Sequence, residues 1–228
     1  MFGIQKGLRF LFCLAVLALA VRHPSPAQAI KDGEVLIHRD RWGVPHIYGN
    51  SIRAVAFGSG YAQAEDHLER MLRLFLKARG ELSKVEGQSA LNQDFIQRML
   101  LIAEIVDANW GRVPHASQDF YQAFADGINR FVDTHPKQKL PWYWKVRARD
   151  AAIYGGFTIL RNGWGVAMRE SGAGGETQEG SNAWAIAGSR SLSGGAMLLA
   201  DPHLPWQSDL QWYESHLKCP EFDVAGAS

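Results

Sequence analysis

Apolar residues change their spacing once along this chain, at residues 171–180, and this change constrains the fold more than any other feature. Before it, apolar residues mostly return at helical spacing; after it, they gather in short runs typical of strands. The segment 171–180 is rich in Gly and polar residues, which is typical of an exposed linker. The sequence therefore predicts an α+β layered fold, with a mostly helical region at 30–170 and a strand-rich region at 181–228.

Two extended segments open the helical region. Residues 34–40 are predicted to form a strand, and residues 43–49, punctuated by Gly and Pro, form a second extended piece. Because the two segments follow each other directly, they predict an early hairpin.

A long helix is predicted after Ser51, where apolar residues begin to return at helical spacing. The pattern is broken near Gly58 and Gly60, and the helix is expected to end at Ala78 or Arg79. Its acidic residues suggest metal or acid–base work, but nearby arginines make an ion-paired, solvated face the better interpretation. These residues are Glu65, Asp66 and Glu69, with Arg70 and Arg73 as the arginines.

Three further helices are predicted from caps and apolar stripes, and we interpret the stripes as core. Asn92 is expected to cap the first, Ser117 the second, and Asp150 to open the third. The stripes are Phe95, Ile96, Met99, Ala103 and Val106; then Phe120, Phe124, Ile128 and Phe131; then Ile153, Phe157 and Leu160.

Two strands are predicted after the linker, at residues 183–187 and 196–200, with a turn at 193–195. Both strands are continuous apolar runs, as in sheets covered on both faces. Ser181 would then begin a strand at the edge of a covered sheet.

The Gly180–Ser181 junction is the candidate catalytic feature. If this bond is cut, Ser181 carries a hydroxyl and a free amine, a nucleophile and a general base on one residue. The reference pKa of such an amine, about 7.7–8.0, suits catalysis near neutral pH. Taken alone, a Gly-Ser pair is equally ordinary turn chemistry.

Residues 1–29 are predicted to be a secretory signal. Lys6 and Arg9 supply a basic start, an apolar run follows at 10–21, and the small residues at 27–29 form a cleavage site. The run is shorter than the roughly 20 residues that span a bilayer. We expect cleavage after Ala29 and export, with an uncleaved membrane anchor as the alternative.

Charge and cysteine content limit which partners and cofactors the protein can have. The formal net charge of +1 argues against a nucleic-acid partner. After signal removal Cys219 is the remaining thiol, and we interpret it as a buried structural residue. No zinc-ligand spacing is present, so the sequence predicts no metal or other cofactor for chemistry. Residues 223–228 end in a strand-like run, which suggests that this is a fragment of a larger unit.

Three ordered blocks of sequence resemble the penicillin acylase family of N-terminal nucleophile hydrolases. The first comprises residues 39–48 and 58–67, the second is the Gly180–Ser181 junction with residues 182–184, and the third comprises 198–206 and 212–217. Within the family, residues 201–206 and 223–228 resemble the glutaryl-cephalosporin and acyl-homoserine-lactone acylases more than the phenylacetyl-penicillin type. The resemblance covers residues 34–228.

This resemblance implies an αββα sandwich, truncated here, and a secreted, periplasmic precursor that cuts itself between Gly180 and Ser181. The spacer 171–180 is trimmed or kept, and the two chains stay together as an α/β heterodimer. The substrates implied are linear amides of N-acylated small molecules, β-lactam antibiotics or acyl-homoserine lactones. Structural calcium, found in some relatives, stays open, although the sequence shows no ligand set for it.

The resemblance also assigns roles to residues. Ser181 is the nucleophile and, through its amine, the base; His203 assists it or is a core histidine. Trp212 and Tyr213 are weaker candidates for substrate contact, and Asp201 and His216 weaker still. The oxyanion hole is expected to use an Asn beyond residue 228, so the fragment alone is expected to be inactive. A non-catalytic remnant that acts as a binding or assembly piece, and a membrane-anchored scaffold, remain the alternatives.

Overall fold

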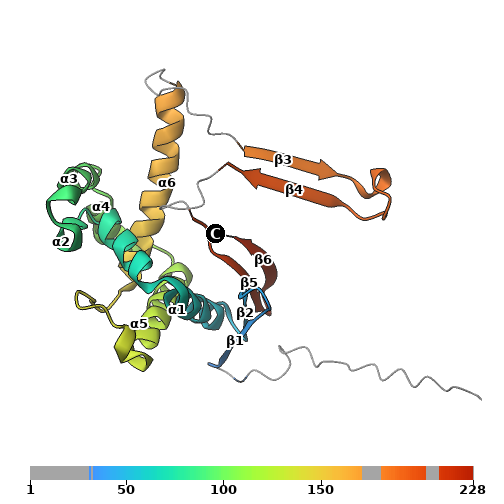
Figure 1. Ribbon diagram of the computed structural model, residues 1–228, viewed down its shortest axis with the longest axis horizontal. Coiled ribbons are helices and arrows are strands. Elements are labelled where there is room, and N and C mark those ends of the chain that lie inside the picture. Colours follow the sequence, from blue (N-terminus) through green and yellow to red (C-terminus); the bar gives the residue numbers. More distant parts are fainter. Residues whose placement is uncertain (1–30, 32, 171–180, 204–210, 228) are drawn as a thin grey trace, which may run out of the picture.

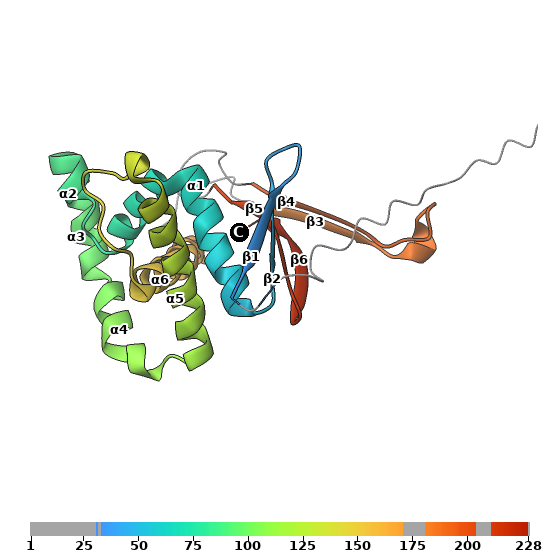
Figure 2. The same cartoon turned by 90° about the horizontal axis from the view of Figure 1, so that it is seen from below.

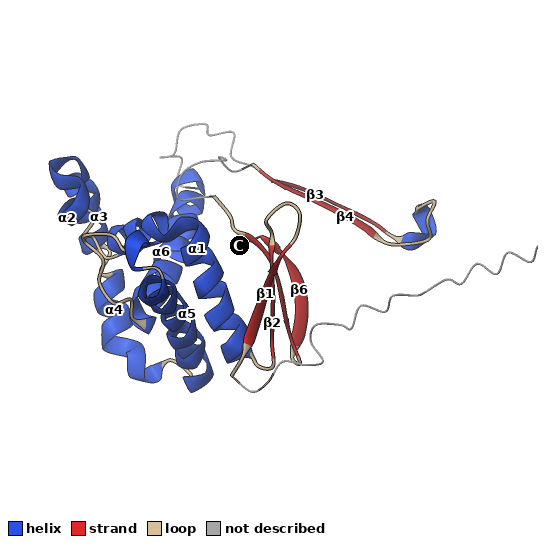
Figure 3. Cartoon of the chain, turned by 60° about the horizontal axis from the view of Figure 1, so that its bottom comes forward, coloured by secondary structure: helices blue, strands red, loops and turns tan. Residues whose placement is uncertain are grey.

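The computed structural model describes residues 31, 33–170, 181–203 and 211–227 of the chain. Its helices gather on one side, and a four-stranded sheet lies against the long helix α1 (Ile52–Ala78) (Figures 1 and 2). A two-stranded hairpin reaches away from both (Figure 3). The predicted signal segment 1–29 and the predicted linker 171–180 lie outside the described residues.

The predicted N-terminal hairpin is confirmed. Strand β1 (Val35–Arg39) pairs antiparallel with β2 (Pro45–Gly49). The Asp40 side chain holds the turn between them, because its Oδ1 accepts the backbone N–H of Trp42 at 2.8 Å and of Val44 at 3.0 Å. Such a side-chain bond to the following backbone is what makes Asp a frequent turn residue.

The four-stranded sheet joins strands from both sides of the predicted linker. Strands β5 (Glu214–Cys219) and β6 (Phe222–Ala227) form a second antiparallel hairpin. Strand β5 pairs in parallel with β2, which gives the order β1-β2-β5-β6 (Figure 1). In this register His46 stands opposite His216, 170 positions later in the chain.

One face of this sheet is apolar and packs against α1. Ile47, Leu217 and Cys219 form a cluster with Val55 and Ala62 of the helix. Cys219 is buried, and its burial raises the pKa of the thiol. The prediction of a buried structural cysteine is therefore confirmed.

Helix α1 begins and ends where the sequence predicts. The Ser51 hydroxyl caps it by accepting a backbone N–H three residues on, at 3.2 Å. Gly58 and Gly60, where the apolar pattern is broken, are helical and buried. The helix is instead interrupted at His67, which has φ −144° and ψ 31°.

Glycines let α1 and α5 (His115–Thr134) approach closely. A Cβ added to Gly60 would stand 2.0 Å from the carbonyl oxygen of Phe124. A Cβ added to Gly127 would stand 2.0 Å from the carbonyl oxygen of Phe57. Glycine therefore breaks the apolar pattern of α1 because it makes room for a backbone, not because the helix bends there.

Shorter helices connect α1 to α5, and a long one follows α5. They are α2 (Ser83–Glu86), the 3-10 turn Gly87–Ala90, α3 (Leu91–Met99), α4 (Ile102–Asn109), the 3-10 turns Trp110–Arg112 and Pro136–Gln138, and α6 (Ala148–Glu170). Within the described ranges, none of the helices combines the length and the apolar character needed to cross a bilayer.

Two predicted caps and one predicted helix are wrong. Asn92 lies inside α3, because the preceding 3-10 turn leads directly into the helix after Ala90. Ser117 lies inside α5, which follows Pro114, a residue whose fixed φ suits a helix start. The predicted helix through Val106 is split into α3 and α4, since Leu101 adopts a left-handed backbone with φ 55°.

The apolar stripe of α3 faces outward, which contradicts its interpretation as core. Phe95, Ile96 and Met99 are 65, 55 and 66 % exposed. The inward side of α3 carries Asp94 instead, whose carboxylate accepts the two backbone N–H groups at the start of α2 at 2.8 Å each. These hydrogen bonds fix the rotation of α3 and so turn its apolar stripe away from the core.

The main core lies between α1, α5 and α6. The predicted core positions that are confirmed are Ile128, Phe131, Ile153 and Phe157, each at most 3 % exposed. Phe120 and Leu160 are 41 and 37 % exposed, so their interpretation as core is wrong. Burial thus declines toward the start of α5 and, on α6, after Phe157.

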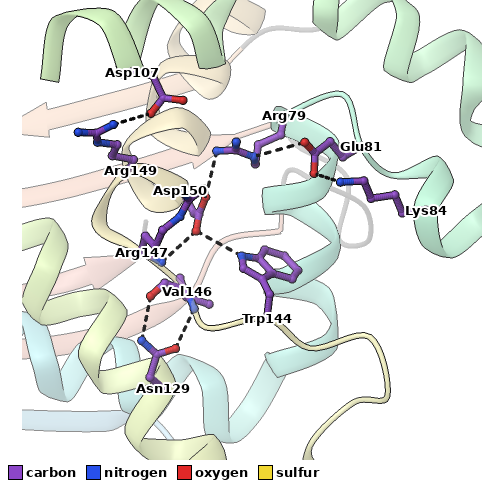
Figure 4. A network of polar contacts seen from close by, with 10 residues as sticks. All are labelled: Arg79, Glu81, Lys84, Asp107, Asn129, Trp144, Val146, Arg147, Arg149 and Asp150. Atoms are coloured by element: carbon purple, nitrogen blue, oxygen red, sulfur yellow. Dashed lines mark hydrogen bonds and ion pairs between the residues drawn. The ribbon is translucent and has the colours of Figure 1, made fainter.

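A buried polar network joins α1 to the start of α6 (Figure 4). The fully buried Asp150 accepts hydrogen bonds from Arg79 at 3.0 Å and from the Trp144 indole at 3.3 Å. It also accepts the Arg147 side chain at 3.2 Å and the Arg147 backbone N–H at 2.9 Å. Asp150 was predicted to open the helix, and it lies in the first turn of α6, two residues after the observed start at Ala148.

Candidate active site

The predicted nucleophile, Ser181, is the first residue of β3 (Ser181–Ile186). This strand pairs antiparallel with β4 (Met197–Pro202), in a register that sets Ser181 opposite Pro202. Both predicted strands are confirmed. Ser181 is exposed. Gly180, and with it the predicted cleavage junction, lies outside the described residues.

The β3–β4 hairpin is exposed on both faces, contrary to the prediction of a covered sheet. Trp184, Leu198 and Leu199 are 66, 78 and 55 % exposed. Their continuous apolar runs are typical of strands buried on both faces. Within the part of the chain that the structure describes, however, α1 covers the four-stranded sheet and not this hairpin.

His203 lies at the same end of the hairpin as Ser181, one residue after β4. Its Nε2 is 3.0 Å from the Asn182 amide nitrogen and 3.3 Å from Asp201 Oδ2. The amide can donate only to an unprotonated Nε2, whereas the carboxylate needs a protonated one. The two neighbours therefore make opposite demands on Nε2, which a single tautomer of the imidazole does not satisfy together. The assisting role of His203 stays a prediction.

The two predicted substrate-contact residues lie close to α1. Tyr213 donates its hydroxyl to Asp66 Oδ2 at 2.7 Å, and its ring meets that of His67 edge-on with centroids 6.0 Å apart. Burial, together with the hydrogen bond to Asp66, raises the pKa of Tyr213 well above its ordinary value. Trp212 is 49 % exposed. None of the described contacts joins either side chain to Ser181, and substrate contact stays a prediction.

The acidic residues of α1 form the predicted ion-paired face. Arg39 of β1 contacts Glu65 at 2.6 Å and Asp66 at 2.9 Å. Arg73 contacts Glu69 at 3.0 Å, one turn earlier on the same helix. These pairings confirm the interpretation as an ion-paired face, although the partner of Glu65 and Asp66 is Arg39 of β1 and not a neighbouring arginine of the helix.

An open groove runs along this part of α1. Its lining includes Asp66, Glu69, Arg70, Arg73, Lys77 and Glu86. Small-molecule sites are mostly apolar, with a few polar groups that orient the ligand. The dense charge of this groove therefore gives no reason to place an acylated substrate in it.

A histidine pair across β2 and β5 was missed by the sequence reasoning. The Nδ1 atoms of His46 and His216 are 2.9 Å apart. On the far side of each ring stands a carboxylate, with Asp223 Oδ1 2.7 Å from His216 Nε2 and Asp40 Oδ2 3.7 Å from His46 Nε2. No spacing in the sequence links the two histidines, since only the pairing of β2 with β5 brings them together.

The resemblance left a structural calcium site open. Among residues 31, 33–170, 181–203 and 211–227, no group of three or more His, Cys, Asp or Glu side chains is arranged to hold a metal ion. Calcium prefers six to eight oxygen ligands, which the ion-paired carboxylates of α1 do not offer.

A helical body, a sheet built from both halves of the chain and a serine that opens a strand together define the mixed α+β fold of the penicillin acylase type of N-terminal nucleophile hydrolases. A solved structure of this type is thermostable penicillin G acylase from Alcaligenes faecalis in tetragonal form. It matches with a TM-score of 0.51 and 23 % sequence identity, over 60 % of this chain and 82 % of that chain. The family model of penicillin amidase matches residues 34–228, and the chain belongs to this family.

Curated relatives include acylases with different named substrates. Acyl-homoserine lactone acylase PvdQ from Pseudomonas fluorescens (strain Pf0-1) is 29 % identical over 232 residues, covering 84 % of this chain and 30 % of that protein. Aculeacin-A acylase from Actinoplanes utahensis is 27 % identical over 274 residues, covering 98 % of this chain and 34 % of that protein. The chain therefore spans about a third of the length of these relatives.

Proposed function

We propose that this chain is part of an exported acylase that hydrolyses the linear amide of N-acylated small molecules after cutting itself between Gly180 and Ser181. The observation that carries the proposal is the position of Ser181. It is the first residue of β3, directly after the linker, within the range that matches the penicillin amidase family. A cut at that point makes the exposed hydroxyl and a new amine available on one residue.

Maturation is an intramolecular acyl transfer. The Ser181 Oγ attacks the carbonyl carbon of Gly180, the C–N bond breaks, and the protonated nitrogen becomes the free amine of Ser181. The resulting ester is hydrolysed by water. The products are one chain that ends in the Gly180 carboxylate and a second chain that begins with Ser181.

Turnover repeats the same chemistry on a substrate. The Oγ attacks the carbonyl of the substrate amide while its proton passes to the Ser181 amine through a bridging water. The proton then goes to the leaving nitrogen, the C–N bond breaks, and an acyl ester remains on Oγ. Water hydrolyses this ester and releases a carboxylic acid. His203, at the same end of the hairpin, assists by orienting the amine.

The substrate class, partners and location follow from the family. The relatives named above act on acyl-homoserine lactones and aculeacin A, and we propose an acyl-homoserine lactone or an N-acylated β-lactam as substrate. Residues 1–29 direct export to the periplasm. The two chains produced by the cut remain associated as a heterodimer.

The test is mass spectrometry of the exported, full-length protein. A chain whose mass starts at Ser181 is expected in the wild type, and Ser181→Ala is expected to remain uncut and without amidase activity. Ser193→Ala is the matched control, because Ser193 is an exposed serine in the turn of the same hairpin. Ser181→Cys is expected to be processed but to turn over amides more slowly. Normal maturation of Ser181→Ala would contradict the proposal.

A further inference from the structure

The histidine pair occupies the outer face of the four-stranded sheet. Ile47 and Leu217 pack toward α1, so their strand neighbours His46 and His216 point to the opposite face. The pair therefore lies at the junction of β2 with β5, where residues from the two sides of the linker meet. His216 is largely buried, with 19 % of its side chain exposed, and His46 is 29 % exposed.

The geometry restricts how many protons the two rings can hold. The facing Nδ1 atoms are 2.9 Å apart, a hydrogen-bond distance, so one must carry a proton and the other must not. The Nε2 of His216 donates to Asp223 at 2.7 Å, which leaves its Nδ1 as the acceptor. His46 therefore donates from Nδ1, and a proton on its Nε2 is favoured by Asp40 at 3.7 Å.

We propose that His46 and His216 form a one-proton bridge that attaches β5 and β6 to the N-terminal body near neutral pH and is opened by acid. A proton added to His46 Nε2 leaves the bridge intact. A further proton on His216 Nδ1 places N–H against N–H at 2.9 Å and breaks the bridge. The bridge is present in the intact chain and so does not depend on the cleavage proposed for Gly180 and Ser181.

The two carboxylates beside the pair do not titrate between pH 5 and 7.5. Lys218 and His216 hold the pKa of Asp223 below its ordinary value. Burial opposes the shift at Asp40, but hydrogen bonds from two backbone N–H groups and from His46 lower its pKa. Both carboxylates therefore stay ionised in this range. The other neighbours are His38, with its ring centroid 6.3 Å from that of His46, and Tyr48, which meets His216 edge-on at 5.6 Å.

The magnitude follows from proton linkage. Histidine in an unfolded chain titrates near pH 6.5, so at pH 5 both rings of the unfolded chain are protonated. The folded state holds one proton fewer as long as the bridge is closed. Stability therefore falls as pH decreases until the bridge opens, and the folding equilibrium constant is expected to drop between pH 7.5 and pH 5 by less than the roughly 30-fold that a bridge closed down to pH 5 would give.

His216→Asn tests the proposal by stability measurements. The Asn Oδ1 can accept the His46 Nδ1 proton in place of the imidazole but cannot be protonated in this range. The free energy of unfolding of the full chain is measured by urea denaturation at pH 7.5 and at pH 5. In the wild type it is expected to decrease at pH 5, and in His216→Asn most of this decrease is expected to be absent. His38→Asn, on the same face of the sheet, is the control and is expected to keep the wild-type loss. If the free energy of unfolding of His216→Asn decreases from pH 7.5 to pH 5 by as much as that of the wild type, the proposal is overturned.

Nitrogen-15 NMR of the histidine-labelled wild-type chain provides a second measurement that does not depend on a variant folding. At pH 7.5 a scalar coupling between the two Nδ1 nuclei is expected, with a proton on one of them. At pH 5 the coupling is expected to disappear. Two uncoupled Nδ1 nuclei at pH 7.5, or a coupling that persists unchanged at pH 5, would refute the bridge.

Discussion

Replacing Asp150 by alanine is expected to lower the free energy of unfolding by about 3 kcal/mol. Removing one partner of a buried ion pair costs about 3–5 kcal/mol, because the other charge remains desolvated. Here that charge is Arg79, whose side chain is 17 % exposed. Glu81, 3.9 Å from Arg79, offers partial replacement, and Arg147 is 60 % exposed and can be hydrated. Both contacts place the expected cost at the low end of the range.

The assay is urea denaturation followed by circular dichroism, together with a thermal melt. For a chain of this size a loss of about 3 kcal/mol corresponds to a decrease in Tm of about 6–12 °C. The matched control is Asp107→Ala, which removes an ion pair with Arg149 in which the two side chains are 42 and 40 % exposed (Figure 4). Exposed pairs contribute about 0–1 kcal/mol. Equal losses in the two variants would refute the reasoning from burial.

Two further predictions concern helix packing and a buried phenol. Gly127→Ala is expected to lower the free energy of unfolding by about 1–3 kcal/mol, since the added Cβ would stand 2.0 Å from the Phe57 carbonyl oxygen. The control is Gly111→Ala, whose Cβ would have nothing within 4 Å. It is expected to change the free energy of unfolding by less than about 0.5 kcal/mol in the same urea assay. Tyr213→Phe removes the hydrogen bond to Asp66 and is expected to cost about 0.5–1.5 kcal/mol. Because the pKa of Tyr213 is higher in the folded chain than in the unfolded chain, this contribution to stability is complete below pH 10 and is lost as the pH rises through the folded pKa. In a spectrophotometric titration, the tyrosine that ionises at the highest pH in the wild type is expected to be missing from Tyr213→Phe. If it is still present in the variant, the assignment is wrong.

Local features of the fold were predictable from the sequence. The bounds of α1 follow from a Ser cap and an apolar stripe, and the β1–β2 and β3–β4 hairpins follow from short strand-like runs separated by turn residues. Each depends on residues close together in the chain. The orientation of α3 was not predictable in this way. It depends on hydrogen bonds from Asp94 to the start of α2, which have no signature in apolar spacing.

The candidate site shows the same division. Ser181 could be proposed because a serine at a strand start after a linker is a local pattern, and the structure places it there. The surroundings of Tyr213 and His216 could not be proposed, since both contact residues more than 140 positions away. The apolar pattern within a strand does not indicate which distant segment pairs with it.

The parallel pairing of β2 with β5 also sets the order in which the chain can fold. The β1–β2 hairpin and the α1–α5 contact join segments within the first 134 residues and can form early, whereas β2 gains its other neighbour only when residues 214–219 are available. Contacts of large sequence separation form slowly, because loop closure must precede their stabilising energy. During synthesis β2 therefore remains an unpaired sheet edge until residues 214–219 have emerged, and an unpaired edge of this kind is prone to aggregation.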